Sequence, residues 1–362
     1  MTGKESKLGR IIGPDVSGPA KSALGVVKVI SVKSPKGQEI KQPTVVNKSV
    51  KEQEPPSGSL RMPRMPKKTP EIRSGIAVIG RFTPWPWGQH PDEAYLADAI
   101  ESLGIPTYRV EPPGEIAMEA EWALFTGHPD SREQMEYWKH THKTILWTLD
   151  WLPDYAERRV VIEAGRKATI FATADKYDWK HRFNVRNHIY LPGACERIAV
   201  TFDPRPRRPC AFMGALYSKR RRAIEKIIRK HKGAVLAEPQ TWIYGAKLAA
   251  YVQETKVIVG DNARNDVNGY WSTRNYVIPG AGGFLLTADV PGLDRDFGIG
   301  EHISVYQNLA ELDEGLGLCI AYDEEREHVR HLGFEHVQKF HSWDERAKQL
   351  ARKIGLLKEI RR

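Results

Sequence analysis

The sequence has few cysteines and no long apolar run. Its 362 residues include only three cysteines, Cys195, Cys210 and Cys319, which are too few and too widely spaced for a disulfide framework or a four-cysteine zinc site. No stretch reaches the roughly 18 apolar residues that a transmembrane helix needs. The first ten residues, MTGKESKLGR, lack the apolar segment of a signal peptide. We therefore expect a cytoplasmic protein without a membrane span.

Several short motifs that carry specific chemistry are also missing. No G-x-G-x-x-G follows the first predicted strand, and no G-x-x-x-x-G-K-S/T occurs, which argues against a dehydrogenase and a P-loop ATPase. Neither H-E-x-x-H nor a C-x-x-C pair is present, which argues against a metal enzyme. We expect no metal and no other cofactor.

Positive charge is concentrated in the first fifth of the chain. The net charge is +10, and residues 1–75 hold 15 Lys and Arg against 6 Asp and Glu, so the remainder is close to neutral. The same residues contain nine of the 24 prolines and no Phe, Trp or Tyr. Such a segment buries too little apolar surface to offset its ordering entropy. We predict a disordered basic tail over 1–75, either a solubilising or tethering leader or an electrostatic arm for nucleic acid or another polyanion.

Short apolar strands alternate with helical patterns from residue 76 onward. The run GIAVIG over 75–80 is typical of a buried parallel strand. An amphipathic pattern over Pro91–Leu103 and a strand over Thr107–Val110 complete a β-α-β unit. Further strands are predicted at 122–126, 144–149, 168–172 and 188–191.

A second series of the same kind follows the Arg- and Pro-rich linker 203–209. Strands are predicted at 210–214, 234–237, 257–260, 283–287 and 303–306. Helices are predicted at 218–231, 244–253, 271–280, 309–316, 324–332 and 343–357. The sequence thus predicts two Rossmann-like, doubly wound α/β domains, 76–203 and 204–362. The carboxyl ends of the strands of both domains should face a common cleft. Ligands of open α/β sheets bind at those ends, so we expect the ligand site in this cleft.

The segment 269–286, GYWSTRNYVIPGAGGFLL, is the most informative part of the second half. It predicts a loop, a short helix, a Gly-Gly turn and a buried strand. Glycines there would let the backbone approach a ligand, and a helix N-terminus would favour an anion. The alternative is a tight helix-strand turn that matters only for packing.

Residues 269–346, which begin with this segment, resemble the C-terminal half of the CgeB-type glycosyltransferases, which are relatives of the "glycosyl transferases group 1". The resemblance covers residues 76–355 and is carried by Tyr270, Trp271, Ser272, Arg274, Tyr276, Gly282-Gly283-Phe284-Leu285-Leu286, Gly292-Leu293, Phe297, Gly300-Glu301, Val305-Tyr306, Arg330, Gly333, His336-Val337, His341-Ser342-Trp343 and Arg346. Upstream, Tyr190-Leu191-Pro192-Gly193, Phe212-Met213-Gly214 and Lys219-Arg220-Arg221 are similar to the family's runs at the junction of its two halves.

This resemblance implies a GT-B architecture, in which the second domain binds a nucleotide sugar and the first binds the acceptor. It also implies that basic side chains, rather than a metal, meet the donor pyrophosphate. The donor-binding residues that it implies are Gly214, Lys219, Arg220, Tyr270, Ser272, Arg274, Gly282 and Gly283. Lys219 and Arg220 could equally belong to a solvated helix face.

One position departs from the family pattern. Relatives carry a Glu after the Tyr that matches Tyr276, and that carboxylate typically holds the donor ribose. Here the position is Val277, which cannot accept hydrogen bonds. Asn275 and Asp261 are possible substitutes, and the departure leaves both donor identity and activity open.

The first half supplies the expected acceptor and catalytic residues. Trp85 and Trp87, in the loop after the first strand, suit the apolar face of a sugar or a base. His90 and His128 could act as a general base near neutral pH, although a loop histidine is more often a surface or capping residue. Asp150, after the strand 144–149, could orient the acceptor, act as base or cap the next helix.

We therefore expect a glycosyltransferase that moves a sugar from a nucleotide-sugar donor to an acceptor hydroxyl. The acceptor could be a glycan, a protein, a small molecule or a modified DNA base. The last option would match phage-type enzymes that act on hydroxymethylated bases in the host cytoplasm. A non-catalytic nucleotide-sugar-binding protein is the alternative from another class.

Overall fold

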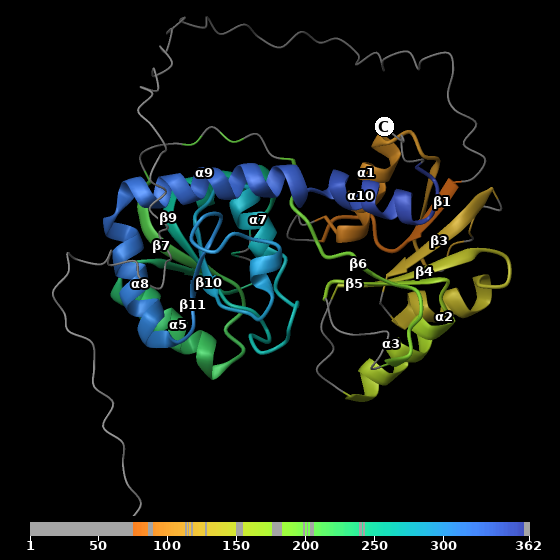
Figure 1. The fold of residues 1–362 in the computed structure, drawn as a ribbon, viewed down its shortest axis with the longest axis horizontal. Helices are drawn as coiled ribbons and strands as arrows, with labels where there is room; N and C mark the ends of the chain where they lie inside the picture. Colours follow the sequence, from red (N-terminus) through yellow and green to blue (C-terminus); the bar gives the residue numbers. More distant parts are fainter. Residues whose placement is uncertain are drawn as a thin grey trace, which may run out of the picture.

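Two parallel β-sheets, each covered by helices, form the body of the protein (Figure 1). The computed structural model describes residues 75–85, 90–112, 114, 116, 119–126, 129–149, 155–175, 183–197, 200, 202, 206–238, 241 and 243–357. The predicted tail lies outside the described residues except for Gly75, with which the first strand begins.

The sheet of the first domain has six parallel strands in the order β2-β1-β3-β4-β5-β6. They are β1 (Gly75–Ile79), β2 (Thr107–Val110), β3 (Ala120–Thr126), β4 (Lys143–Thr148), β5 (Ile170–Thr173) and β6 (His188–Tyr190). All of β1 is buried because alternate residues join different cores. Ile76 and Val78 pack with α1 (Asp92–Ser102), whereas Ala77 and Ile79 pack with α2 (Pro129–Trp138) and α3 (Tyr155–Lys167).

The second sheet has five parallel strands in the order β11-β10-β9-β7-β8. They are β7 (Arg208–Met213), β8 (Ala234–Leu236), β9 (Thr255–Gly260), β10 (Leu285–Ala288) and β11 (Ser304–Tyr306). Its helices are α5 (Lys219–Lys230), α6 (Gly245–Gln253), α7 (Arg274–Gly280), α8 (Leu309–Ala321) and α9 (Asp323–Phe340). The predicted linker is shorter than expected, since Arg208 and Pro209 already belong to β7.

The strand orders fix where ligands can bind. All strands of a sheet run in the same direction, but the order in which successive strands are added reverses between β1 and β3 in the first sheet and between β7 and β9 in the second. Loops diverge at such switch points and leave a crevice at the carboxyl ends of the strands. The loops after β1, β3, β7 and β9 are therefore the ones that position a site.

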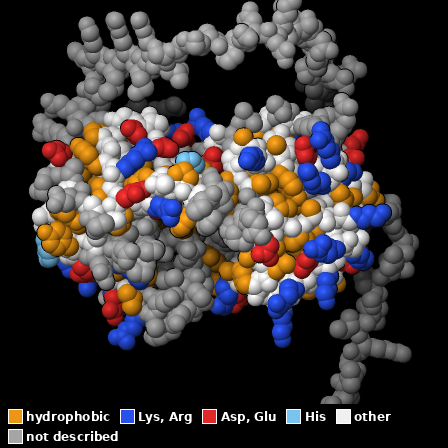
Figure 2. Space-filling view, turned by 180° about the vertical axis from the view of Figure 1, so that it is seen from behind, with side chains coloured by type: hydrophobic (Ala, Val, Ile, Leu, Met, Phe, Trp, Pro, Cys, Tyr) orange, Lys and Arg blue, Asp and Glu red, His pale blue; other side chains and the backbone are white. Residues whose placement is uncertain are grey.

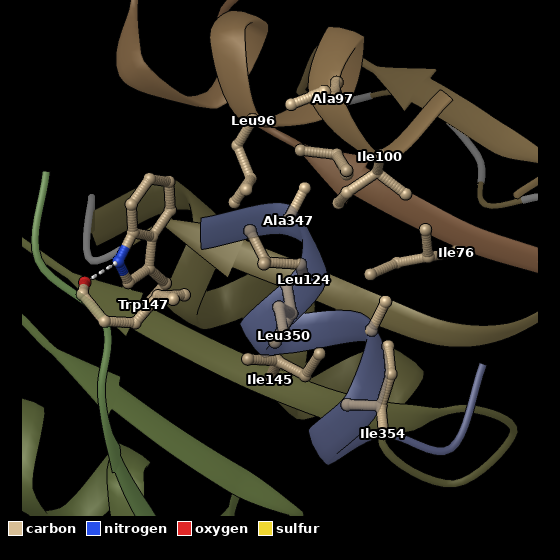
Figure 3. Close-up of a cluster of buried hydrophobic side chains, with 14 of the residues drawn as sticks. Ile76, Leu96, Ala97, Ile100, Leu124, Ile145, Trp147, Ala347, Leu350 and Ile354 are labelled. Atoms are coloured by element: carbon tan, nitrogen blue, oxygen red, sulfur yellow. Dashed lines mark hydrogen bonds between the residues drawn. The ribbon is translucent and has the colours of Figure 1, made fainter. Parts of the chain in front are cut away.

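The last helix, α10 (Trp343–Lys353), leaves the second domain and packs against the first. Ala347 and Leu350 are fully buried among Ile76, Leu124 and residues of α1 (Figure 3). The sequence places the closing helices in the domain 204–362, but the core of the first domain contains α10. An apolar stripe on α10 fits whichever sheet offers a matching face, so the pattern alone does not choose the partner.

The chain crosses between the domains twice, and the two connections bond to each other. The Cys195 amide donates to the His341 carbonyl (3.0 Å), and the Trp343 amide donates to the Cys195 carbonyl (3.1 Å). In Figure 1, α9 and α10 lie almost in line, one over each domain. The two connecting segments are thus hydrogen-bonded to each other where they pass between the domains.

Helix α9 is longer than its predicted range 324–332, because Gly333 does not end it. A side chain at this position would meet the carbonyl oxygen of His302. Glycine therefore lets α9 pass close to the loop before β11. Among the described helices, none is both long and apolar enough to cross a membrane.

Candidate functional site

A cleft of about 790 Å³ lies between the two domains, at the carboxyl ends of both sheets. The first domain contributes Thr126 at the end of β3 and Trp147–Leu149 at the end of β4. The second contributes Met213 and Gly214 at the end of β7 and most of the segment 270–278. These are the edges where the switch points predict a ligand site.

Two guanidinium groups meet on the second-domain wall, beside Gly214. A side chain on Gly214 would place its Cβ 3.0 Å from Arg274 Nη2 and 3.4 Å from Arg221 Nη1. The glycine also has a φ of +148°, which other residues rarely adopt. The absence of a side chain at residue 214 therefore leaves space beside both guanidinium groups, which line the cleft.

Arg221 is held by backbone and carboxylate acceptors. Its Nε donates to Asp261 Oδ2 (3.2 Å), its Nη2 to the Asp261 carbonyl (2.9 Å) and its Nη1 to the Ala215 carbonyl (3.1 Å). Arg220 Nε donates to the other oxygen of Asp261 (2.8 Å). The Asp261 carboxylate thus accepts hydrogen bonds from both Arg220 and Arg221, and these bonds fix Arg221 on the cleft wall.

Arg274 has a different environment, because no carboxylate among the described residues pairs with it. Its Nη1 donates to Ser272 Oγ (3.1 Å), a neutral acceptor. Burial, and secondarily the nearby charge of Arg221, lowers the pKa of the Arg274 guanidinium from its usual value. Both causes penalise the positive charge, so an anion entering the cleft beside Gly214 would relieve a real electrostatic cost. Phosphate oxygens fit this position because a guanidinium binds them with two parallel hydrogen bonds.

The loop before α7 positions Ser272, and Ser272 in turn positions Arg274. Asn262 Oδ1 accepts from the Ser272 amide (2.7 Å), and Asn262 is itself bonded to Asn265. Asn265 Nδ2 donates to Asp261 Oδ1 (3.2 Å). A continuous polar network therefore runs from Arg221 through the loop after β9 to Ser272 and Arg274 at the start of α7.

The opposite wall belongs to the first domain and carries an aromatic ring and two carboxylates. Trp85 is partly exposed, and the Arg81 guanidinium lies 4.0 Å from its ring centroid. Glu93 accepts from the Arg81 amide (3.0 Å) and fills the space that a side chain on Gly80 would need. Asp92 lies beside Glu93 in the first turn of α1, and both residues line the cleft. This wall can thus offer a stacking surface and a proton acceptor to a second substrate.

The structure places the predicted residues in three groups. Five line the cleft: Trp85, Gly214, Tyr270, Ser272 and Arg274. Five do not: His90, Lys219, Arg220, Gly282 and Gly283. Three lie outside the described residues: Trp87, His128 and Asp150.

The residues away from the cleft have other contacts. The His90 ring packs 5.7 Å from the Tyr95 ring, and Lys219 is exposed on α5. Gly282, with a φ of +77°, packs against Val200, and its carbonyl accepts from the buried Arg330. Gly283 makes the turn into β10. The Gly-Gly pair therefore has a packing environment, whereas its predicted donor contact stays a prediction.

Sequence reasoning missed several lining residues, among them Arg221, Tyr217, Asp92 and Glu93. One signal could have found Arg221: it lies three residues before Ile224 and seven before Ile228, on the buried face of α5. A helix with that spacing turns residue 221 inward and residues 219 and 222 outward. No comparable signal marks Tyr217.

Val277 lines the cleft one turn after Arg274, and neither proposed substitute for a carboxylate reaches the wall. Asn275 is buried and its Oδ1 accepts from Thr287 Oγ1 (3.3 Å). Asp261 is bonded to Arg220 and Arg221. Among the described second-domain residues that line the cleft, none is an Asp or a Glu.

Comparison with known proteins agrees with this architecture. Residues 203–352 match the family model described as "Glycosyl transferase-like". No curated protein matches the chain. Among solved structures, three that are similar over most of their length are sucrose-phosphate synthase from Thermosynechococcus elongatus (TM-score 0.57, 11% identity, 78% of this chain and 98% of that one), a glycosyltransferase from Rickettsia africae ESF-5 (0.54, 9%, 79% and 99%) and HepE of Anabaena in complex with UDP (0.53, 8%, 78% and 100%).

At these identities the structural likeness shows the fold alone, and it confirms the predicted α/β architecture of GT-B type. The family match covers the second domain, including the arginine wall of the cleft. Match and fold together support a glycosyltransferase.

Proposed function

We propose that the cleft binds a nucleoside-diphosphate sugar, with the diphosphate at Arg221 and Arg274, and that the sugar passes to an acceptor hydroxyl on the Trp85 side. The observation that carries this proposal is Arg274, a largely buried cation that lines the cleft beside Gly214 and forms no ion pair with a described carboxylate. HepE, one of the similar structures, was solved with UDP, which makes UDP the first nucleotide to test.

In the reaction, the acceptor oxygen attacks the anomeric carbon and the bond from that carbon to the diphosphate oxygen breaks. The nucleoside diphosphate leaves with the bonding electrons, and the acceptor proton passes to a base. Fixed positive charge near the departing diphosphate stabilises the transition state more than the ground state. We assign that role to Arg274 and Arg221, without a metal ion. Asp92 and Glu93 are carboxylates on the acceptor side, and His90, His128 and Asp150 remain predicted base candidates.

The test is nucleotide binding by the full chain, measured by calorimetry with UDP, GDP, ADP and TDP. We expect one nucleotide to bind and Arg274→Ala to weaken it about 30-fold or more, because a charge-assisted phosphate contact is lost. Arg229→Ala is the matched control, since Arg229 is exposed on α5 and paired with Glu225. Affinity should be unchanged by EDTA. Equal binding by Arg274→Ala and the native protein would contradict the proposed diphosphate site.

A nucleic-acid acceptor, such as a modified DNA base, is the second candidate, favoured by α5. Lys219, Arg222 and Lys226 are exposed on this helix, and no ion pair joins them to another described residue. Figure 2 shows Lys and Arg side chains projecting from the second domain at the lower right. Duplex DNA should then bind with an affinity that falls steeply with salt, and a Lys219→Ala/Arg222→Ala/Lys226→Ala variant should reduce the slope. Salt-independent or absent binding would return the acceptor to the glycan, protein or small-molecule classes.

We also propose the closer relationship to CgeB-type enzymes and a cytoplasmic location, in keeping with three buried, free cysteines. A non-catalytic nucleotide-sugar-binding protein remains the other class of function. It predicts that UDP or another nucleotide binds, but that no donor sugar is consumed with any acceptor or with water.

A further inference from the structure

Both connections between the domains pass a largely buried cluster of two tyrosines and one aspartate. Tyr190 ends β6 in the first domain, Tyr276 lies on α7, and Asp296 follows the short 3₁₀ helix η2 (Leu293–Arg295). The hydroxyls of Tyr190 and Tyr276 donate to the same oxygen, Asp296 Oδ2, at 2.9 and 2.8 Å. We call Tyr190, Tyr276 and Asp296 the junction cluster. It joins a first-domain residue directly to two elements of the second domain.

The second connection packs on the same cluster. The His341 ring, at the end of α9, stacks on the Tyr276 ring at a centroid distance of 4.9 Å. Arg346 of α10 donates to His341 Nδ1 (3.0 Å) and to the carbonyl of Pro192 (3.1 Å), which lies in the first connection. Tyr276 is 1% exposed and Asp296 is 9% exposed. A change in the angle between the domains would therefore have to rearrange bonds to this buried pair.

The junction cluster also reaches the cleft, although none of its three members lines it. Trp271 Nε1 donates to the Tyr276 hydroxyl (2.8 Å), and the Trp271 side chain is part of the cleft wall. Arg274 lies on α7 two residues before Tyr276. Helix α7, which carries Arg274, is thus anchored at the domain junction through Tyr276.

We propose that Tyr190, Tyr276 and Asp296 are positioning residues that set donor affinity from outside the cleft by fixing α7 and Trp271 relative to the first domain. A short helix with one anchored side chain can shift as a unit when the anchor is loosened. The free energy needed to order α7 again then opposes ligand binding, so the ligand binds more weakly. The inference rests on the proposed function for its ligand, and UDP is the probe.

The experiment compares Tyr190→Phe with the native full chain. Tyr190→Phe removes one hydroxyl and leaves Tyr276, Trp271 and Arg274 unchanged. We expect UDP to bind about 3- to 30-fold more weakly, the range in which couplings between distant sites fall. The amides of residues 276–278, 280 and 281 should also exchange hydrogen faster. Tyr95→Phe is the matched control, since that hydroxyl bonds to Glu196 near the same junction and not to the cluster. It should change neither readout.

A double-mutant cycle distinguishes positioning from general loss of stability. If Tyr190 acts through α7, adding Tyr190→Phe to Arg274→Ala causes a much smaller further loss of UDP affinity than in the native background. Additive losses would overturn the proposal. So would native UDP affinity and native exchange of α7 in Tyr190→Phe. Tyr276→Phe is the second variant for both measurements. If the native chain binds no nucleotide, the proposed function fails, and the exchange of α7 alone still decides the positioning role.

Discussion

Arg274 and Val277 lie one turn apart on α7, and together they set the charge and polarity of the second-domain wall of the cleft. Arg274 supplies a positive charge without a carboxylate partner among the described residues, and Val277 supplies an apolar surface beside it. Residues three apart on a helix share a face at about 5–6 Å. A ribose attached to a diphosphate at Arg274 would therefore contact an apolar side chain.

This pairing predicts little discrimination between ribose and 2′-deoxyribose. The native protein should bind UDP and dUDP with dissociation constants that agree within about threefold, because the wall offers no carboxylate to the 2′-hydroxyl. Val277→Glu should raise the dUDP/UDP ratio to about 10, in line with a hydrogen bond to a charged group. The ratio cancels any repulsion between the new carboxylate and the diphosphate. Val277→Leu is the control and should leave the ratio near one. A native ratio already near 10 would mean that another group binds the ribose.

At the scale of elements, α10 completes the core of the first domain although it lies at the far end of the chain. Leu350 and Ala347 are fully buried beneath α1, and Trp147 of β4 donates to the Leu191 carbonyl at the edge of the same cluster (Figure 3). Trp147 also lines the cleft. Helix α10 therefore supports the carboxyl end of β4, where Trp147 lines the cleft.

Leu350→Ala should lower the free energy of unfolding by about 2–5 kcal/mol, since a buried leucine is replaced by a cavity. Urea unfolding followed by circular dichroism would measure it. Arg352→Ala, on the exposed face of α10, should change the same quantity by less than about 0.5 kcal/mol. Equal effects of the two variants would show that α10 does not stabilise the first domain.

At the scale of the whole molecule, two histidines, one on β6 and one at the domain junction, are neutral when the protein is folded. Burial, and secondarily the charge of Arg346, lowers the pKa of His341 to about 3. Burial alone lowers the pKa of His188, on β6, to about 4. In the unfolded chain both histidines titrate near 6.5. Below that pH the unfolded chain therefore binds more protons than the folded protein does.

It follows that stability is fully present above about pH 6.5 and is lost as the pH falls toward 4. For His341 alone the loss between pH 7 and pH 5 should be about 2 kcal/mol. Urea unfolding at the two pH values would measure it. His341→Gln should be less stable at pH 7 but lose about 2 kcal/mol less on acidification. An unchanged pH dependence in that variant would place the titration elsewhere.

The sequence by itself determined the order and type of the elements. Apolar runs that end in glycine, and helical stripes between them, follow from local geometry and burial, so the strands 107–110 and 257–260 and the helix 244–253 agree with β2, β9 and α6 to within two residues. The segment 269–286, part of which lines the cleft, also stands out in the sequence alone.

Only the tertiary structure decided which side chains share the cleft and which partners they have. The spacing of Ile224 and Ile228 already places Arg221 on the buried face of α5, but only the packing of that face on the second sheet brings Arg221 to the cleft. Asp92 and Glu93 of the first domain line the same cleft as Arg221 and Arg274 of the second. The junction cluster joins residues 190, 276 and 296. Contacts between residues so far apart depend on how the two domains dock, and no local pattern in the chain encodes that geometry.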